Sequence, residues 1–161
     1  MINTKTSFSL FFLLASLVAC DDDAKKYTAE FPRFEPLQLK LAENELPKVG
    51  KSVVVEAPQR KMGKHLYEVT YQWTVSGPAE AVQRYGKSNI YTERTPAPTD
   101  TITFSQSGRY NIVLVASYEV SGIGKGQSFT ENFPAKMGSA KYDGSALKYR
   151  VTLERTIDVD D

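Results

Sequence analysis

Beyond Leu37, apolar and polar residues alternate one by one along much of the chain. The clearest run is Tyr67–Val75, in which every odd-numbered position is apolar and every even-numbered position is polar. Successive side chains of a β-strand point to opposite faces, so this period of two is typical of a strand with one buried face. Alternation or short β-branched runs predict further strands at residues 37–41, 52–56, 101–104, 109–120 and 147–159.

The spacing of these runs predicts an all-β fold. Several strands separated by turn residues, with little helical periodicity, are typical of a β-sandwich. Residues 79–85 are the exception, because Pro78 precedes them and Gly86 follows, as at the ends of a short helix. A helix of about two turns is marginal by itself, so a simple turn is the alternative.

Two connections in the predicted sandwich are long, residues 76–100 and residues 121–145. Connections of this length in a compact domain are usually functional or disordered. They carry five aromatic residues outside the strand alternation: Tyr85, Tyr91, Phe129, Phe133 and Tyr142. Such rings could stack on a ligand such as a sugar, and they could equally anchor the loops to the sandwich.

The amino terminus has a different pattern, a largely apolar run from Phe8 to Val18 that follows the single charge of Lys5. This run of 11 residues is too short for a membrane-spanning helix, which needs about 20. The small residue Ala19 and then Cys20, the only cysteine, come next. The segment resembles a bacterial lipoprotein signal peptide with its lipobox. The resemblance implies cleavage before Cys20, a diacylglycerol on its sulfur and acylation of the new amino terminus.

This assignment divides the chain into a signal peptide (1–19), a lipidated acidic and proline-containing tether (20–36) and a β-sandwich domain (37–161). Loss of Lys5 with the signal peptide brings the formal net charge from +1 to zero. A balanced chain has no electrostatic footprint for nucleic acid or anionic lipid. The expected membrane contact is through acyl chains on Cys20, because two or more such chains anchor a protein stably.

Three segments together resemble the core of a PKD or PKD-like domain: Tyr71–Trp73, Thr101–Phe104 and Ser107–Leu114. The resemblance implies an immunoglobulin-like sandwich of about seven antiparallel strands, with four aromatic residues in its core: Tyr71, Trp73, Phe104 and Tyr110. Physical reasoning agrees, because one Trp can fill the space between two sheets and a Tyr after a turn can return its hydroxyl to the backbone. No ligand is carried over from the family, since residues 76–78 depart from its usual Gly-Asp-Gly and residues 121–145 form a longer loop than usual.

An acidic run, Asp21, Asp22 and Asp23, follows Cys20 directly. PKD-like domains in anchored lipoproteins are familiar from the surface glycan-uptake systems of the Bacteroidota, where an acidic run after the lipidated cysteine is an export signal. The resemblance implies an outer-membrane protein at the cell surface. In proteobacterial lipoproteins an Asp after the cysteine instead implies retention in the inner membrane, so a protein that faces the periplasm is one alternative. A soluble linker is the other.

The residues that catalysis or metal binding would require are absent or isolated. His65 is the only histidine, and Cys20 is assigned to lipid, so no nucleophile has an imidazole base nearby in sequence. No His and Cys cluster has zinc spacing, and residues 158–161 lack the spacing of a calcium loop. Residues 122–128 resemble a phosphate loop only in their glycines, since Gly126 stands where Ser or Thr is needed. We therefore expect no catalytic residue, no metal site and no cofactor.

Together these patterns predict a surface lipoprotein that binds without catalysing a reaction. Its sandwich would present the two long loops to a glycan or a partner protein, as an accessory to glycan uptake or to cell-surface adhesion. One alternative is a structural module that docks onto a neighbouring outer-membrane protein through a sheet edge. A small glycosidase is a more remote alternative, which requires two carboxyl groups about 5–10 Å apart in a groove.

Overall fold

The structure, a computed structural model, describes residues 29–42, 45–83, 90–91, 95–120 and 138–161. These residues form strands and connections, and none of them lies in a helix. Among them, therefore, no helix is long and apolar enough to cross a membrane. The strands, in chain order, are β1 (Arg33–Phe34), β2 (Gln38–Lys40), β3 (Ser52–Glu56), β4 (Gln59–Lys61), β5 (Leu66–Ser76), β6 (Val82–Gln83), β7 (Ile90–Tyr91), β8 (Thr99–Thr103), β9 (Gly108–Val120), β10 (Gly138–Asp143) and β11 (Lys148–Val159).

The largest sheet has the strand order β10-β11-β9-β5-β7, with every pairing antiparallel. Strand β9 lies in its centre and pairs with β11 over almost its whole length, from Gly108 opposite Val159 to Glu119 opposite Lys148. These long strands follow from the sequence, because β9 alternates between buried and more exposed positions throughout, and β11 does so except at Glu154–Thr156, which are all exposed. The outer face carries mostly polar side chains.

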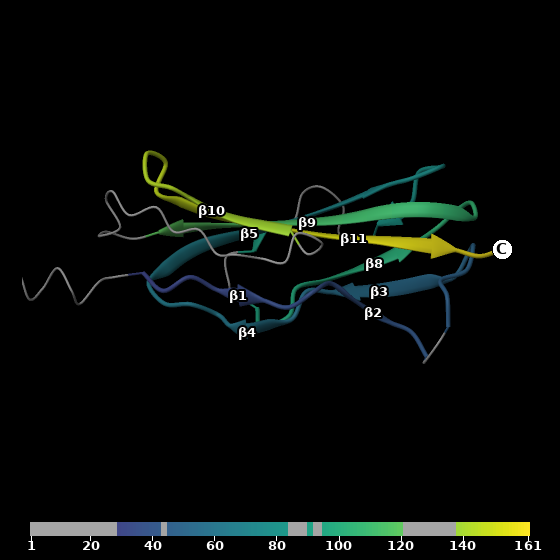
Figure 1. Cartoon of the computed structure of the whole chain (residues 1–161), viewed down its shortest axis with the longest axis horizontal. Coiled ribbons are helices and arrows are strands. Elements are labelled where there is room, and N and C mark those ends of the chain that lie inside the picture. The colour runs from purple at the N-terminus through teal and green to yellow at the C-terminus, as the bar shows by residue number, and fades with distance from the viewer. Residues whose placement is uncertain (1–28, 43–44, 84–89, 92–94, 121–137) are drawn as a thin grey trace, which may run out of the picture.

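The remaining strands lie in a second layer. Strands β2, β3, β8 and β6 form a four-stranded antiparallel sheet in that order, and β1 pairs with β4 beside it. Figure 1 shows this layer below the β10-β11-β9-β5-β7 sheet, with the two layers facing each other. The molecule is thus an all-β protein of antiparallel sheets whose core lies between the layers.

Aromatic side chains fill the space between the layers. Tyr71, Trp73, Phe104 and Tyr110, the core residues expected from the sequence, have no exposed surface. Trp73 lies on β5 in the large sheet, next to the central strand β9. Truncation of a fully buried aromatic side chain to Ala typically costs about 3–5 kcal/mol, so these four residues account for a large share of the stability.

Tyr110 begins the buried face of β9 directly after a turn. Its hydroxyl donates a hydrogen bond to the carbonyl of Gln106 at 2.9 Å, four residues upstream. Its ring packs against Phe104 with 4.7 Å between the ring centroids. A buried phenol needs a partner for its hydroxyl, and the turn at residues 105–107 supplies one.

The helix considered for residues 79–85 is not present in the described part of that segment. Residues 77–79 form a bend, and Val82–Gln83 are strand β6, with Val82 opposite Thr103 of β8. Two turns of helix are too few to persist without tertiary support, whereas pairing with β8 satisfies the backbone. Of the two predictions for residues 79–85, the turn is closer to the observed bend and short strand than the helix is.

The predicted tether of residues 20–36 extends too far toward the domain. Ala29 and Phe34 are buried, and β1 pairs with β4. The folded part therefore begins no later than Ala29, rather than at Leu37. An apolar ring such as that of Phe34 is stabilised by burial, and the composition of a proline-containing segment gave no sign of it.

The two predicted loops are also partly strand. Strands β6 and β7 lie within residues 76–100, and β10 lies within residues 121–145. Strand β10 reads Gly-Ser-Ala-Lys-Tyr-Asp, which has few β-branched residues, and its pairing with β11 overrides its weak strand propensity.

Candidate functional site

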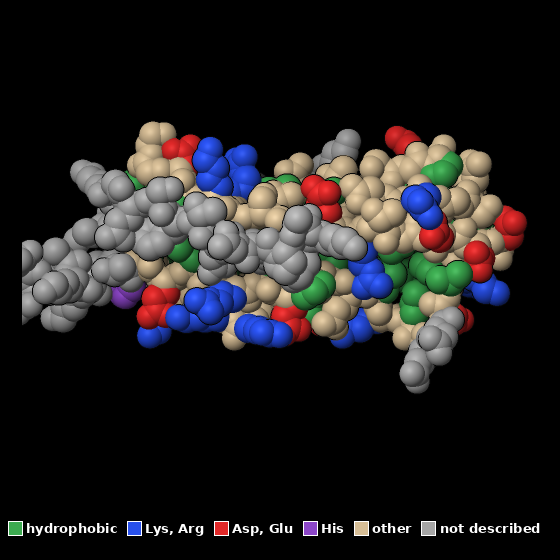
Figure 2. Space-filling model, viewed as in Figure 1, with side chains coloured by type: hydrophobic (Ala, Val, Ile, Leu, Met, Phe, Trp, Pro, Cys, Tyr) green, Lys and Arg blue, Asp and Glu red, His purple; other side chains and the backbone are tan. Residues whose placement is uncertain are grey.

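A groove opens between the edge of β2 and the last part of β11, and we call it the β2–β11 groove. It has a volume of about 400 Å³. One side consists of Leu39 of β2 with residues of the connection to β3: Leu41, Ala42, Glu45, Leu46 and Pro47. The other side is formed by β11 residues Arg155, Thr156, Ile157 and Asp158. Figure 2 shows hydrophobic side chains open to this face in the right-hand half of the molecule.

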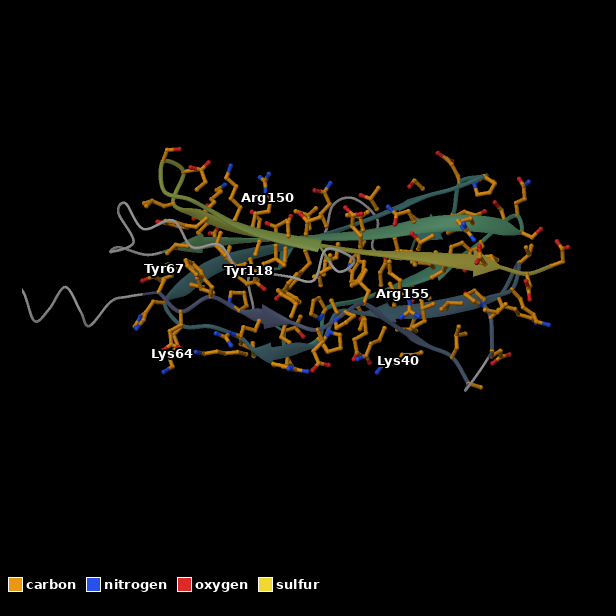
Figure 3. All side chains as sticks on the ribbon, viewed as in Figure 1. Lys40, Lys64, Tyr67, Tyr118, Arg150 and Arg155 are labelled. Atoms are coloured by element: carbon orange, nitrogen blue, oxygen red, sulfur yellow. The ribbon has the colours of Figure 1, made fainter. Side chains whose placement is uncertain are left out.

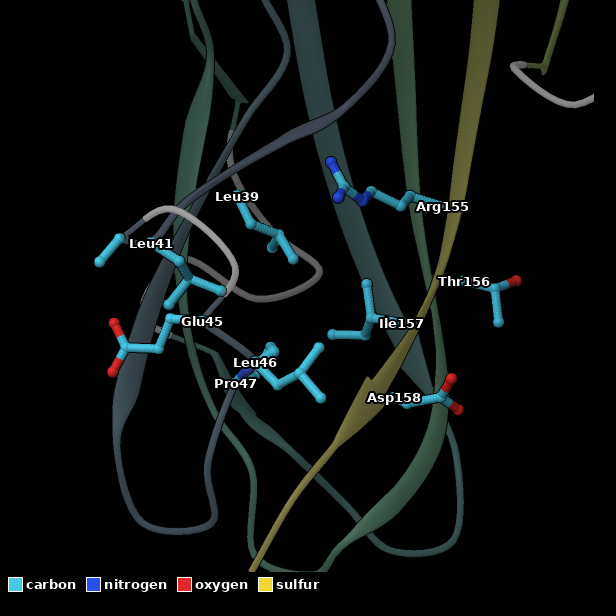
Figure 4. A pocket seen from close by; sticks show the side chains of 10 residues that line it. Leu39, Leu41, Glu45, Leu46, Pro47, Arg155, Thr156, Ile157 and Asp158 are labelled. Carbon is cyan, nitrogen blue, oxygen red and sulfur yellow. The ribbon is translucent and has the colours of Figure 1, made fainter.

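Alternation along β11 decides which of its side chains enter the groove. Figure 4 shows Arg155 and Ile157 directed toward Leu39 and Leu46, whereas Thr156 and Asp158 point to the other side of the strand. Ile157 is buried, while Leu46 is 48% exposed. Apolar side chains of Leu39, Leu46 and Ile157 thus face one another across the groove beside the guanidinium of Arg155, and part of the Leu46 side chain is in contact with solvent.

Hydrogen bonds join the two sheets at both ends of the groove. At one end Arg155 donates from Nη1 to the carbonyl of Leu37 at 2.6 Å. At the other end Val49 donates its backbone N–H to the carbonyl of Asp160, and Asp160 donates its own to the carbonyl of Pro47, both at 2.9 Å. These bonds connect the two sides of the groove at its ends.

Charges next to the groove are mixed. Arg109 of β9 donates to both carboxylate oxygens of Asp158, at 2.9 Å from Nε and 3.3 Å from Nη2. This hydrogen bond and ion pair lower the pKa of Asp158 and raise the pKa of Arg109. Glu45 and Glu154 are exposed near the same region. Arg155 lines the groove as well, so the charges of the lining are close to balanced, and Glu154 lies outside the lining.

A second cluster of aromatic side chains lies in the other half of the molecule. Phe31 stacks on Tyr149 with 4.1 Å between centroids, and it lies 5.6 Å from the ring of Tyr142. Tyr118 extends the cluster, 6.4 Å from Tyr149 and 6.3 Å from Tyr71. Figure 3 shows Tyr118 and Arg155 in opposite halves of the molecule, so this cluster is separate from the β2–β11 groove.

Tyr142 is the one predicted ligand-contact residue whose side chain the structure describes. It is only 6% exposed and belongs to the hydrophobic core, so its ring anchors β10 to the sandwich and is not available to stack on a ligand. The backbone of Tyr91 lies in β7 opposite Val69. The other predicted ligand-contact residues lie outside the described part of the chain: Tyr85, Phe129 and Phe133.

Cys20 and the acidic run of residues 21–23 lie outside the described residues. His65 is exposed in a bend with a positive φ of 53°. Within the described ranges, no group of three or more His, Cys, Asp or Glu side chains is arranged to hold a metal ion.

Sequence reasoning did not anticipate a polar group inside the sandwich. Gln59 donates from Nε2 to the carbonyl of Thr95 at 2.6 Å, and its Oε1 accepts from the hydroxyl of Tyr118 at 3.4 Å. Asp100 is fully buried in β8, and its carboxylate accepts from the N–H of Thr101 at 2.7 Å. The burial of Asp100 could have been predicted from the sequence, because Asp100 occupies the same face of the alternating strand as Ile102.

The residues of the β2–β11 groove were also not predicted from the sequence. Arg155 stands between Leu153 and Ile157 on the inward face of β11, where an apolar residue is expected, and the residue itself is exposed at the groove. That break in the alternation was a usable sign of the groove. The meeting of Leu39 and Leu46 with β11 could not be inferred, since these segments lie more than a hundred residues apart in the chain. No protein-family model, curated protein or solved structure matches the chain at a significant level.

Proposed function

We propose that this chain is a membrane-anchored surface lipoprotein without enzymatic activity, whose β-sandwich binds a partner protein. Docking through the sandwich edge, the alternative noted from the sequence, fits the geometry better than ligand binding by loop aromatic residues. The observation that carries this choice is the β2–β11 groove, a site of mixed polar and apolar lining in which Leu46 is left in contact with solvent.

The position of the groove supports the proposal. Figure 1 shows the chain entering the described region at the end of the molecule opposite to the carboxyl terminus, and the groove lies toward that carboxyl-terminal end. A lipid on Cys20 would therefore hold the far end of the molecule near the membrane. The groove would then face away from the bilayer, where a partner can reach it.

We also propose that the fold is an immunoglobulin-like, PKD-like sandwich. The order β2-β3-β8-β6 corresponds to the A-B-E-D sheet of an immunoglobulin constant-type domain, and β11-β9-β5 corresponds to G-F-C. Trp73 then lies on strand C, and the hydroxyl of Tyr110 bonds back to the turn, as in a tyrosine corner. Strands β7 and β10 would be additions at the two edges of the larger sheet.

The roles in glycan uptake, in adhesion and in glycoside hydrolysis receive less support. The burial of Tyr142 removes one of the five aromatic residues expected to contact a sugar. A glycosidase requires a general acid whose pKa is raised, whereas the hydrogen bond from Arg109 lowers the pKa of Asp158, whose side chain also points away from the interior of the groove. Partner docking at the cell surface is therefore the function that we favour.

The anchor can be tested directly by replacement of the lipidated residue. We expect Cys20→Ser to move the protein from the membrane fraction to the soluble fraction of the cell envelope, because the acyl chains are the proposed membrane contact. Membrane fractionation, with labelled palmitate as a second readout, measures the change. Lys25→Gln, outside the lipobox, serves as the control and should remain lipidated. A Cys20→Ser protein that stays in the membrane would rule out the lipobox assignment.

A further inference from the structure

The last part of β11 has one edge that no described strand covers. Strand β10 pairs with β11 only as far as Leu153, which lies opposite Gly138. The connection that precedes β3 reaches the same edge only at Asp160. Between these two contacts, β9 is the one described strand with which residues 154–158 pair. At about 3.3 Å per residue, this stretch is about 13 Å long.

The hydrogen bonds of Asp160 show which backbone groups point to this edge. Its N–H and its carbonyl both bond to the connection at residues 47–49, away from β9. In an antiparallel strand the backbone groups of alternate residues point to the same neighbour. The N–H and C=O groups of Glu154, Thr156 and Asp158 therefore face the open edge, while those of Arg155 and Ile157 face β9.

The β2–β11 groove lies directly inside this edge. Arg155 and Ile157 project into it, and Leu39 and Leu46 lie across from them. A strand added to β11 would point every second side chain into the groove and the others to solvent. Backbone pairing would supply affinity, and the groove would select apolar residues at alternate positions.

The charges along the edge argue against a second copy of this chain as the occupant. Antiparallel self-pairing centred on Thr156 would place Glu154 of each copy opposite Asp158 of the other. Pairing centred on Arg155 would place two arginines opposite each other. Like charges directly across a strand pair are destabilising. A partner with cationic side chains opposite Glu154 is complementary instead.

From these observations, and resting on the proposed docking function, we propose that β11 accepts an extended segment of a partner protein as an added antiparallel strand over residues 154–158. The segment has apolar side chains at the positions that face the β2–β11 groove and a Lys or Arg opposite Glu154. Its backbone bonds to the outward N–H and C=O groups of Glu154, Thr156 and Asp158.

The unliganded protein provides the first test. The full chain in detergent micelles should show alternating amide hydrogen exchange along the end of β11 by NMR, with fast exchange at Glu154, Thr156 and Asp158 and slow exchange at Arg155 and Ile157. Uniformly slow exchange at all five amides would mean that the edge is already covered and would overturn the proposal.

A synthetic peptide provides the second test. The probe is a capped nonapeptide in which isoleucine alternates with lysine and threonine, compared with a peptide of the same composition in blocked order. We expect the alternating peptide alone to bind with a dissociation constant below about 1 mM and to slow exchange at the three outward amides. Equal binding of the two peptides, or no binding of either, would overturn the proposal.

One substitution isolates the backbone contribution. Thr156→Pro removes an N–H that faces the open edge and leaves the bonds to β9 intact, and proline is tolerated at such edge positions. It should weaken peptide binding by about tenfold or more, whereas the control Thr156→Val, which keeps the N–H, should change it by less than about threefold. Unchanged affinity of a folded Thr156→Pro protein would exclude strand addition.

A charge variant covers the case in which Thr156→Pro does not fold. Glu154 is exposed, so Glu154→Lys preserves the fold and should weaken peptide binding by about three- to tenfold at low ionic strength, with a smaller effect at high salt. Tighter binding to this variant would contradict the proposed partner chemistry. All these outcomes are independent of the lipid anchor, so a negative result here leaves the Cys20→Ser test of the anchor unaffected.

Discussion

Tyr110 is enclosed on several sides at the start of β9. Its hydroxyl bonds to the carbonyl of Gln106, its ring packs on Phe104, and Gly77 lies against the ring edge. A Cβ built on Gly77 would lie closer to ring atoms of Tyr110 than real contacts allow. The glycine is thus required for close approach, and the same bend that replaces the expected helix brings it there.

We expect Gly77→Ala to destabilise the protein by about 1–3 kcal/mol, because the added methyl group must displace a fully buried ring. Urea unfolding monitored by tryptophan fluorescence would measure the change, since Trp73 is the only tryptophan. Gly144→Ala is the matched control, because the nearest atom to its added Cβ is 3.6 Å away, an ordinary contact. Equal stability of the two variants would contradict this packing.

At the scale of elements, β1 and β4 fasten the amino-terminal segment to the domain. Glu30 exchanges backbone hydrogen bonds with Lys64 at 3.0 and 2.9 Å. Its carboxylate also forms ion pairs with Lys61 at 2.5 Å and Lys64 at 3.3 Å. These contacts lie at the end of the domain where the proposed tether begins. They therefore separate the folded domain from the tether and resist fraying of β1.

The Glu30 contacts predict a specific pH dependence. Hydrogen bonds from Lys61 and then Lys64 lower the pKa of Glu30 from its usual 4.5, because they favour the carboxylate. A group with a lowered folded pKa stabilises the fold above its unfolded value, and that contribution is lost as the pH falls through the folded value. The stability difference between wild type and Glu30→Gln should therefore be present at neutral pH, decrease as the pH falls below 4.5, and be lost once the pH is below the lowered pKa of the folded state.

Carboxyl NMR titration provides the direct measurement for this contact. It should place the pKa of Glu30 below 4.5 in the wild type. Lys61→Gln should move it back toward that value, because the largest stabilising hydrogen bond is removed. A Glu30 titration that does not respond to Lys61→Gln would show that the ion pair is not formed in solution.

At the scale of the whole molecule, the two ends have different roles under the proposed function. The end near Ala29 leads to the lipid, and the end near Asp160 carries the β2–β11 groove. The chain has a formal net charge of only +1, so its overall charge attracts membranes and nucleic acids weakly. Selective contact would then come from the groove and the edge of β11.

The acidic run after Cys20 should decide which side of the outer membrane the protein faces. We expect protease treatment of intact cells to remove the wild-type protein. A variant with Asp21, Asp22 and Asp23 all changed to Asn should remain membrane-bound and protected, because the proposed export signal depends on negative charge. Cell lysis before protease treatment is the control and should expose both. Equal shaving of the two proteins from intact cells would show that the run is only a linker.

Much of the strand content could be predicted because a strand's alternation is a local property. The buried faces of β5 and β9, with Trp73 and Tyr110 on them, follow directly from a period of two. Boundaries were less predictable where few apolar residues mark them, as at Phe34 in β1. Strand β10 has weak propensity and exists through its pairing with β11.

The β2–β11 groove and the edge of β11 beside it are formed by segments that lie far apart in the chain. The sequence alone determined an all-β chain and the inward faces of its long strands, and the lipoprotein signal that it predicts at the amino terminus stays a prediction. Only the tertiary structure decided that β10 pairs with β11 as far as Leu153, that residues 47–49 meet Asp160, and that no described strand covers the edge of β11 between them. The physical reason is that strand register and sheet order depend on which surfaces bury together, and a pattern with a period of two is compatible with many such arrangements.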